Sequence, residues 1–118
     1  MEEWSDLVTS SLSTGSPIVV DFTATWCKPC KAIAPFFKEL AENHDATFVK
    51  VDVDELDELA NGTFSVSMMP TFVVCRGKEG GGKGKGGAGL EILEKLAGAN
   101  EVRLEEMVGR HAARFEKE

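Results

Sequence analysis

Two cysteines three positions apart are the residues of this sequence best suited to chemistry. They stand in the stretch Trp26-Cys27-Lys28-Pro29-Cys30, and thiols at this spacing can close a disulfide across one helical turn. A cysteine at a helix start faces unpaired backbone N–H groups, which favour its thiolate form. Pro29 suits a first helical turn, where its missing N–H costs nothing. The spacing therefore predicts thiol–disulfide exchange, with Cys27 attacking and the more buried Cys30 able to attack a mixed disulfide at Cys27.

A zinc site is the alternative use of such a pair. Tetrahedral zinc needs four ligands, but the sequence holds no second C-x-x-C, and His44 and His111 follow no ligand spacing. Redox chemistry is therefore the preferred interpretation. The third cysteine, Cys75, stands in the middle of an apolar run, and we interpret it as a small buried hydrophobic residue rather than a third redox thiol.

Alternating strands and helices are predicted to position the cysteines. The expected strands are 18–22, 47–53, 71–75 and 90–96, and the expected helices are about 3–13, 29–43, 55–60 and 100–115. The last helix would be capped by Asn100. Its buried stripe would consist of Leu104, Met107, Val108, His111 and Phe115. This order of elements indicates an α/β fold whose mixed sheet is covered by helices on both faces.

Length and composition favour one domain over residues 1–118. The net charge of −7 repels phosphate backbones, so no nucleic acid partner is expected. No apolar run reaches the ~18 residues of a membrane span, and the acidic start lacks the features of a secretory signal. With only three cysteines, too few for a secreted disulfide scaffold, we expect a cytoplasmic protein without membrane attachment. The glycine-rich stretch 77–89 is interpreted as a flexible loop insertion within this domain.

Four ordered blocks of residues carry a family resemblance. They are VDFTATWC (20–27), IAPFF (33–37), VDVDEL (51–56) and MPTF (69–72). Through them the sequence resembles the thioredoxins, most closely the plant h-like branch of eukaryotic cytosolic thioredoxins. The resemblance spans about residues 4–114 and implies a thioredoxin-like three-layer α/β/α sandwich. It also implies a protein-disulfide reductase that serves electron transport and cell redox homeostasis.

The resemblance implies roles for single residues. Cys27 would be the attacking cysteine and Cys30 the resolving one. Asp21 would be a buried acid that assists proton transfer at Cys30, with Lys50 beside it. An acid inside an apolar strand is costly unless it is paired or functional, which supports this role independently. The alternative is an acid at an exposed edge of the strand. The substrate groove would be lined by Trp26, Lys28, Pro29, Met69, Pro70, Thr71, Ala97 and Gly98, with a cis peptide bond before Pro70.

The implied reaction needs no cofactor in this chain beyond the redox-active disulfide Cys27–Cys30. The implied partners are disulfide-bearing target proteins and an electron donor. That donor would be a flavin-containing, NADPH-dependent thioredoxin reductase or an equivalent protein.

The sequence departs from the family pattern in three places. Lys28 stands where the family usually has glycine, which adds a positive charge beside Cys27. The usual first strand is absent, so the strand 47–53 would form an open sheet edge, and we expect a monomer or a weak dimer. The stretch 77–89 replaces a tight hairpin turn.

Two other functions compete with the reductase. One is a non-enzymatic interaction module that binds partners through the same groove and is switched by redox state. Retention of both cysteines, Asp21 and Pro70 argues against it. The other is a more oxidising disulfide oxidase or isomerase, which the extra charge of Lys28 favours.

Overall fold

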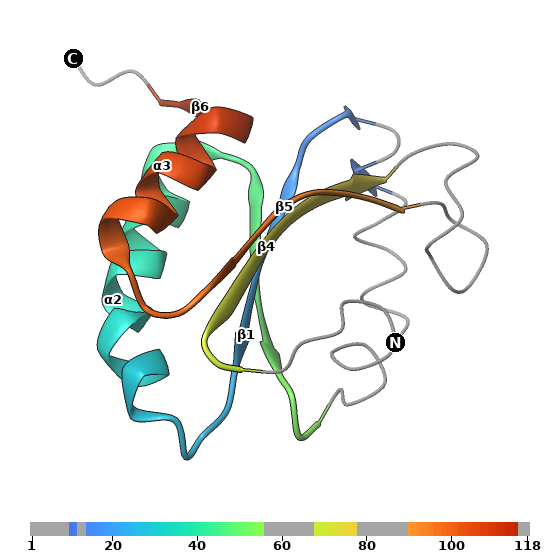
Figure 1. The fold of residues 1–118 in the computed structure, drawn as a ribbon. Coiled ribbons are helices and arrows are strands. Elements are labelled where there is room, and N and C mark those ends of the chain that lie inside the picture. The colour runs from blue at the N-terminus through green and yellow to red at the C-terminus, as the bar shows by residue number, and fades with distance from the viewer. Residues whose placement is uncertain (1–9, 12–13, 56–67, 78–89, 116–118) are drawn as a thin grey trace.

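The computed structural model describes residues 10–11, 14–55, 68–77 and 90–115 (Figure 1). Its elements are β1 (Ile18–Thr23), α2 (Lys28–Asn43), β2 (His44–Asp45), β3 (Thr47–Asp52), β4 (Thr71–Gly77), β5 (Leu90–Ala97), α3 (Glu101–His111) and β6 (Ala113–Arg114). The four predicted strands and the helix after the cysteines are confirmed. The helices expected at 3–13 and 55–60 lie mostly outside the described residues, as does the glycine-rich loop.

The main sheet is mixed, as predicted, with strand order β3-β1-β4-β5. β1 runs parallel to β3, while β4 pairs antiparallel with both β1 and β5. Parallel neighbours need a crossover connection, and α2 supplies it between β1 and β3. Within the described ranges no strand pairs with the outer edge of β3.

Both faces of the sheet are buried. α2 and α3 lie side by side on one face (Figure 1), and the core beneath them contains Val19, Ile33, Phe37, Leu40, Phe72, Val74, Leu104, Met107 and Val108. The opposite face buries Ile18, Val20, Phe22, Val51, Val73, Cys75 and Leu90. Successive side chains of a strand point to opposite faces, so β1 and β4 contribute to both cores. The α/β class is therefore confirmed.

The chain leaves α3 earlier than predicted. Asn100 caps the helix as expected, and its side chain accepts a hydrogen bond from the Arg103 N–H at 3.0 Å. The helix ends at His111, and the next residues pair with β2 as the short strand β6. Phe115 is consequently 49% exposed rather than part of the buried stripe. Its N–H donates to the Asn43 carbonyl, 2.8 Å away, which holds this turn of the chain against the end of α2.

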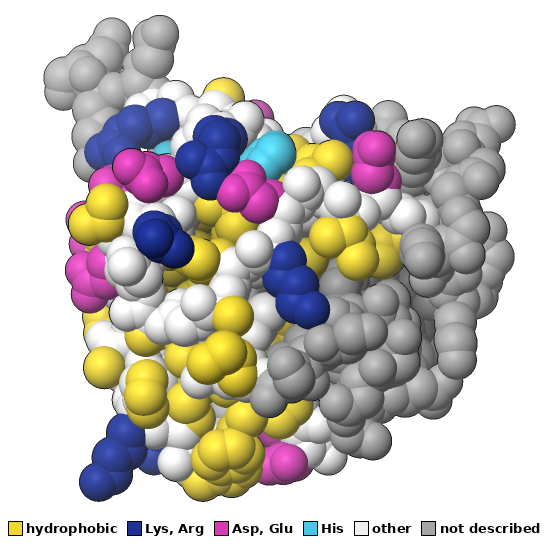
Figure 2. Space-filling view, in the orientation of Figure 1, with side chains coloured by type: hydrophobic (Ala, Val, Ile, Leu, Met, Phe, Trp, Pro, Cys, Tyr) yellow, Lys and Arg dark blue, Asp and Glu magenta, His cyan; other side chains and the backbone are white. Residues whose placement is uncertain are grey.

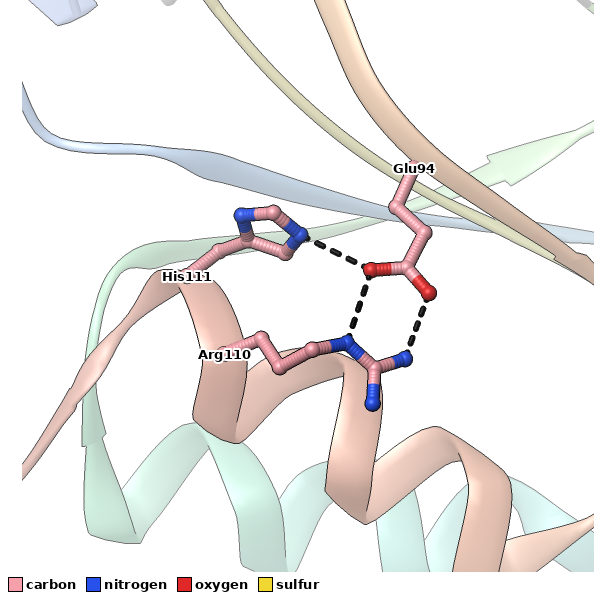
Figure 3. A network of polar contacts seen from close by, with 3 residues as sticks. All are labelled: Glu94, Arg110 and His111. Atoms are coloured by element: carbon pink, nitrogen blue, oxygen red, sulfur yellow. Dashed lines mark hydrogen bonds and ion pairs between the residues drawn. The ribbon is translucent and has the colours of Figure 1, made fainter.

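A polar cluster joins β5 to the end of α3 (Figure 3). The Glu94 carboxylate accepts hydrogen bonds from Arg110, including one of 3.1 Å from Nε, and lies 2.9 Å from Nε2 of His111. These contacts, above all those with Arg110, lower the pKa of Glu94 to about 2. His111 was predicted to lie in the buried stripe, but it sits beside that stripe with 22% of its side chain exposed. A basic last turn also suits the negative end of the helix dipole.

Candidate active site

The predicted cysteine pair lies at the first turn of α2. Cys27 and Cys30 form a disulfide whose Cα atoms are 5.3 Å apart. Cys27 is the N-cap of the helix, and its Sγ accepts a hydrogen bond from the Cys30 N–H, with N and S 3.3 Å apart. Pro29 fits this first turn because it has no N–H to satisfy. Cys30 is 2% exposed and Cys27 5%, so the predicted placement of the two thiols is confirmed.

Three separate segments enclose the disulfide. Cys27 and Cys30 pack with Ala24, which follows β1, with Val53, which follows β3, and with Met69, which precedes β4. Two large apolar side chains in these segments, Trp26 and Met68, remain mostly exposed. An exposed apolar patch beside a redox-active disulfide is typical of a protein-docking surface. Figure 1 shows the start of α2 at the lower end of the molecule, and Figure 2 shows apolar side chains gathered at that end.

The segment before β4 meets the loop between β5 and α3. The Met69–Pro70 peptide bond is cis, as the resemblance implied. The Pro70 carbonyl accepts a hydrogen bond from the Gly98 N–H at 2.8 Å. Gly98 has a φ of +101°, a backbone conformation that favours glycine. Pro70 is buried, whereas Ala97 is exposed and Gly98 half-buried, so this junction brings together the predicted groove residues of both segments.

Thr71 is positioned differently from the other predicted groove residues. Its side chain is only 1% exposed, and its hydroxyl donates a hydrogen bond to the Met68 carbonyl oxygen. The hydroxyl therefore stabilises the turn that carries Met69 and Pro70 and does not face solvent. Lys28 and Pro29, by contrast, are exposed at the start of α2.

Asp21 is a buried acid in β1. It is 1% exposed and alternates with Val20 and Phe22 of the opposite core, so it lies on the sheet face covered by α2 and α3. Its Oδ1 has no hydrogen-bond partner in the described parts of the chain. Burial raises the pKa of Asp21 to about 6, although the positive charge of Lys50, its register neighbour on β3, acts in the opposite direction. Lys50 itself is exposed.

Nearly the whole sequence is similar to known proteins. A family model described as Thioredoxin matches residues 1–99. The chain belongs to the thioredoxin family. A Thioredoxin H-type from Brassica campestris is 46% identical over 103 residues, which cover 86% of this chain and 83% of that protein. Thioredoxin H1 from Arabidopsis thaliana is 37% identical over 114 residues, covering 96% and 89%.

Solved thioredoxin structures share the fold. The thioredoxin NaTrxh from Nicotiana alata superposes with a TM-score of 0.77 at 36% identity, covering 94% of this chain and 86% of that one. Reduced Schistosoma mansoni thioredoxin pre-protein gives a TM-score of 0.74 at 40% identity, covering 93% and 90%. Thioredoxins are protein-disulfide oxidoreductases, and the Cys27–Cys30 disulfide supplies the redox pair here. This thioredoxin is therefore an enzyme of thiol–disulfide exchange.

Sequence reasoning missed the contact of Asp54 with Trp26, the residue next to Cys27 in this thioredoxin. The Trp26 Nε1–H donates to Oδ2 of Asp54 over 3.0 Å. Trp26 follows β1 and Asp54 follows β3, and the carboxyl ends of parallel strands meet at the same sheet edge. The acids directly after the strand predicted at 47–53 were the signal that could have located this contact.

The third cysteine takes no part in the site. Cys75 is fully buried in β4, and burial raises the pKa of its thiol to about 12. Its interpretation as a small buried hydrophobic residue is confirmed. Across the ranges that the structure describes, no group of three or more His, Cys, Asp or Glu side chains could hold a metal ion. None of the helices there is long and apolar enough to span a membrane.

Proposed function

We propose that this thioredoxin reduces disulfides of other proteins in two exchange steps. In the first, the Cys27 thiolate attacks one sulfur of the target disulfide, and the other target sulfur leaves as a thiolate. In the second, the Cys30 thiolate attacks Sγ of Cys27, releases the remaining target thiolate and closes the Cys27–Cys30 disulfide. Two electrons pass to the target. The main support is the position of Cys27 at the start of α2, where the helix N–H groups favour a thiolate.

Asp21 is assigned the proton transfer at Cys30. A resolving thiol must lose its proton before it can attack, and an acid with a pKa of about 6 can accept that proton near neutral pH. The assignment is supported by the burial of Asp21 and by its place on the face covered by α2, the helix that carries Cys30. Lys50, which lies on β3, would stabilise the negative charge of the Asp21 carboxylate.

The target would dock on the groove around the disulfide. Trp26, Lys28 and Pro29 would contact it from the side of α2, and Met69, Pro70, Ala97 and Gly98 from the junction of β4 and the loop after β5. The exposure of Trp26 and the hydrogen bond between Gly98 and Pro70 support this grouping. Thr71 would act as a positioning residue for Met69, because its own side chain is buried.

The cellular setting follows the family. We propose one thioredoxin domain over residues 1–118, with residues 77–89 as a loop insertion, acting in the cytoplasm without nucleic acid or membrane partners. The chain would carry no cofactor, and a flavin-containing, NADPH-dependent thioredoxin reductase or an equivalent donor would restore its dithiol.

Reduction of insulin disulfides is the direct test. The protein should accelerate insulin reduction by dithiothreitol, or by NADPH with a reductase. A protein that binds targets without accelerating this reaction would be an interaction module instead. A redox titration that placed the Cys27–Cys30 pair among oxidising disulfides would favour the oxidase or isomerase.

Lys28 should raise the thiolate fraction of Cys27 in the reduced protein. An ammonium group close to a sulfur stabilises its anion, and a stabilised thiolate makes the disulfide a better oxidant. Lys28→Gly should slow iodoacetamide alkylation near pH 7 and make the reduction potential more negative. Because Lys28 is exposed, we expect only about a two- to fivefold change in alkylation rate, which shrinks at high salt. If the alkylation rate and the reduction potential did not change, Lys28 would act only through contacts with target proteins.

The open edge of β3 should support weak self-association at high concentration. Its outer backbone groups have no strand partner among the described residues, and such an edge can pair with another copy. Lys50 is exposed on β3, and a lysine on an edge strand disfavours pairing with another copy. Sedimentation should therefore show a monomer that dimerises only weakly, and Lys50→Thr should strengthen the association. If both proteins stayed purely monomeric up to millimolar concentration, the edge would not be a contact surface.

A further inference from the structure

Charged side chains divide the rim of the disulfide into two sides, the first of which is basic. Lys28 and Lys31 are both exposed in the first turn of α2, which contains no acidic residue. Residues three positions apart on a helix share a face, so the two ammonium groups lie on the same side of the rim. The Lys31 N–H donates to the Cys27 carbonyl, 3.3 Å away, which keeps this turn at the disulfide.

The other side of the rim is acidic. The Asp54 carboxylate is held 3.0 Å from the indole nitrogen of Trp26, the residue next to Cys27. Oδ1 of Asp52 accepts the Asp54 N–H at 2.8 Å and fixes the turn, which continues into the exposed Glu55. Figure 1 shows the start of α2 and the end of β3 on opposite sides of the lower end of the molecule, and Figure 2 shows a basic side chain to the left of the apolar patch there and an acidic one to its right.

We propose that this two-sided rim selects target disulfides by the charges of the residues that flank them. The favoured target has an acidic residue toward Lys28 and Lys31 and a basic residue toward Asp54. The reversed arrangement brings like charges together on both sides, and such contacts disfavour an encounter. This inference rests on the proposed function and deepens it by naming a substrate class.

The charge pattern around the disulfide differs from the net charge of the whole molecule. A net charge of −7 attracts basic proteins over long distances without regard to their orientation. Lys28 and Lys31 oppose that attraction on one side of the disulfide only. A uniformly basic target therefore gains less from this rim than a target with one acidic and one basic flank.

Two short peptides of equal composition test the proposal. Each carries one cysteine in a disulfide with a chromogenic thiol, with two Asp on one side of the cysteine and two Lys on the other, in opposite order. The reduced protein should release the chromophore from one order at least about threefold faster at low salt, given the modest worth of exposed ion pairs. The ratio should approach one at high salt. Because both peptides meet the same thiol, the ratio does not depend on the reactivity of Cys27.

Charge reversal on one side separates this rim from the rest of the surface. Lys28→Glu combined with Lys31→Glu should bring the ratio of the release rates of the two peptides close to one at low salt. Lys38→Glu combined with Arg114→Glu changes the net charge equally, at exposed positions on the middle of α2 and on β6, and should keep the wild-type ratio. Equal rates for both orders with the wild-type protein, or a preference that survives the Lys28/Lys31 change, would overturn the proposal. Failure to reduce either peptide would instead contradict the proposed function.

Discussion

A Cys30→Ser variant is expected to stop halfway through the reaction and remain covalently attached to its target. Cys27 would still attack the target disulfide, but no second thiol would stand one helical turn away to displace it. Cys27→Ser should lose the first step and with it reduction altogether, with turnover down roughly a thousandfold or more. Incubation with a disulfide-bearing protein, followed by non-reducing electrophoresis and intact mass measurement, distinguishes the two variants.

The opposite result is as informative. If Cys27→Ser accumulated the covalent complex and Cys30→Ser did not, the attacking and resolving roles would have to be exchanged. Cys75→Ala is the matched control, because it removes the third cysteine thiol of the chain from a fully buried site in β4. It should reduce targets at close to the wild-type rate and form no persistent complex.

Asp21→Asn is expected to make the protein more stable at neutral pH. The folded state raises the pKa of Asp21 from 3.8 to about 6, so folding disfavours the charged form. The native state then binds the proton more tightly than the unfolded chain, and stability is lost as the pH rises from about 4 to about 6. Asparagine removes this loss, which amounts to about 3 kcal/mol for a shift of this size. Urea unfolding should show the gain at pH 7.5 and almost none at pH 3.5.

The same substitution should slow the second exchange step. An asparagine cannot accept the Cys30 proton, and loss of such a general base costs about a hundredfold in rate. Stopped-flow decay of a preformed mixed disulfide at pH 7 measures this step alone. Asp45→Asn, a change of an exposed acid on β2, serves as the control for both measurements. Asp21 would have no part in the mechanism if the Asp21→Asn protein resolved the mixed disulfide at the wild-type rate. Its stability would then also be expected to equal that of the wild-type protein at pH 7.5 and at pH 3.5.

The elements around the cysteines could be predicted because their signals are local. An apolar run marks β1, and helical periodicity with Pro29 near its start marks α2. The position of Cys27 at the junction follows directly from these two elements. The cis bond before Pro70 had no local signal and followed only from the family resemblance.

Most of the features that the sequence did not predict depend on contacts between distant parts of the chain. The early end of α3 is accompanied by pairing between β6 and β2, each only two residues long and without any periodicity to detect. The ion pairs of Glu94 and the hydrogen bond between Trp26 and Asp54 join residues at least 16 positions apart. The hydrogen bond of the Thr71 hydroxyl is local, but the sequence pattern does not show whether this hydroxyl faces the groove or donates to the Met68 carbonyl oxygen.

The burial of Cys75 bears on the fidelity of the redox cycle. A third thiol within reach of Cys27 or Cys30 could be exchanged into the disulfide and leave the chain scrambled. Cys75 is held neutral, because burial raises its pKa to about 12, and it lies fully enclosed in β4. A neutral, inaccessible thiol neither attacks nor is attacked. The chain can therefore be oxidised and reduced many times and return to the same two states, without a repair step for mispaired sulfur.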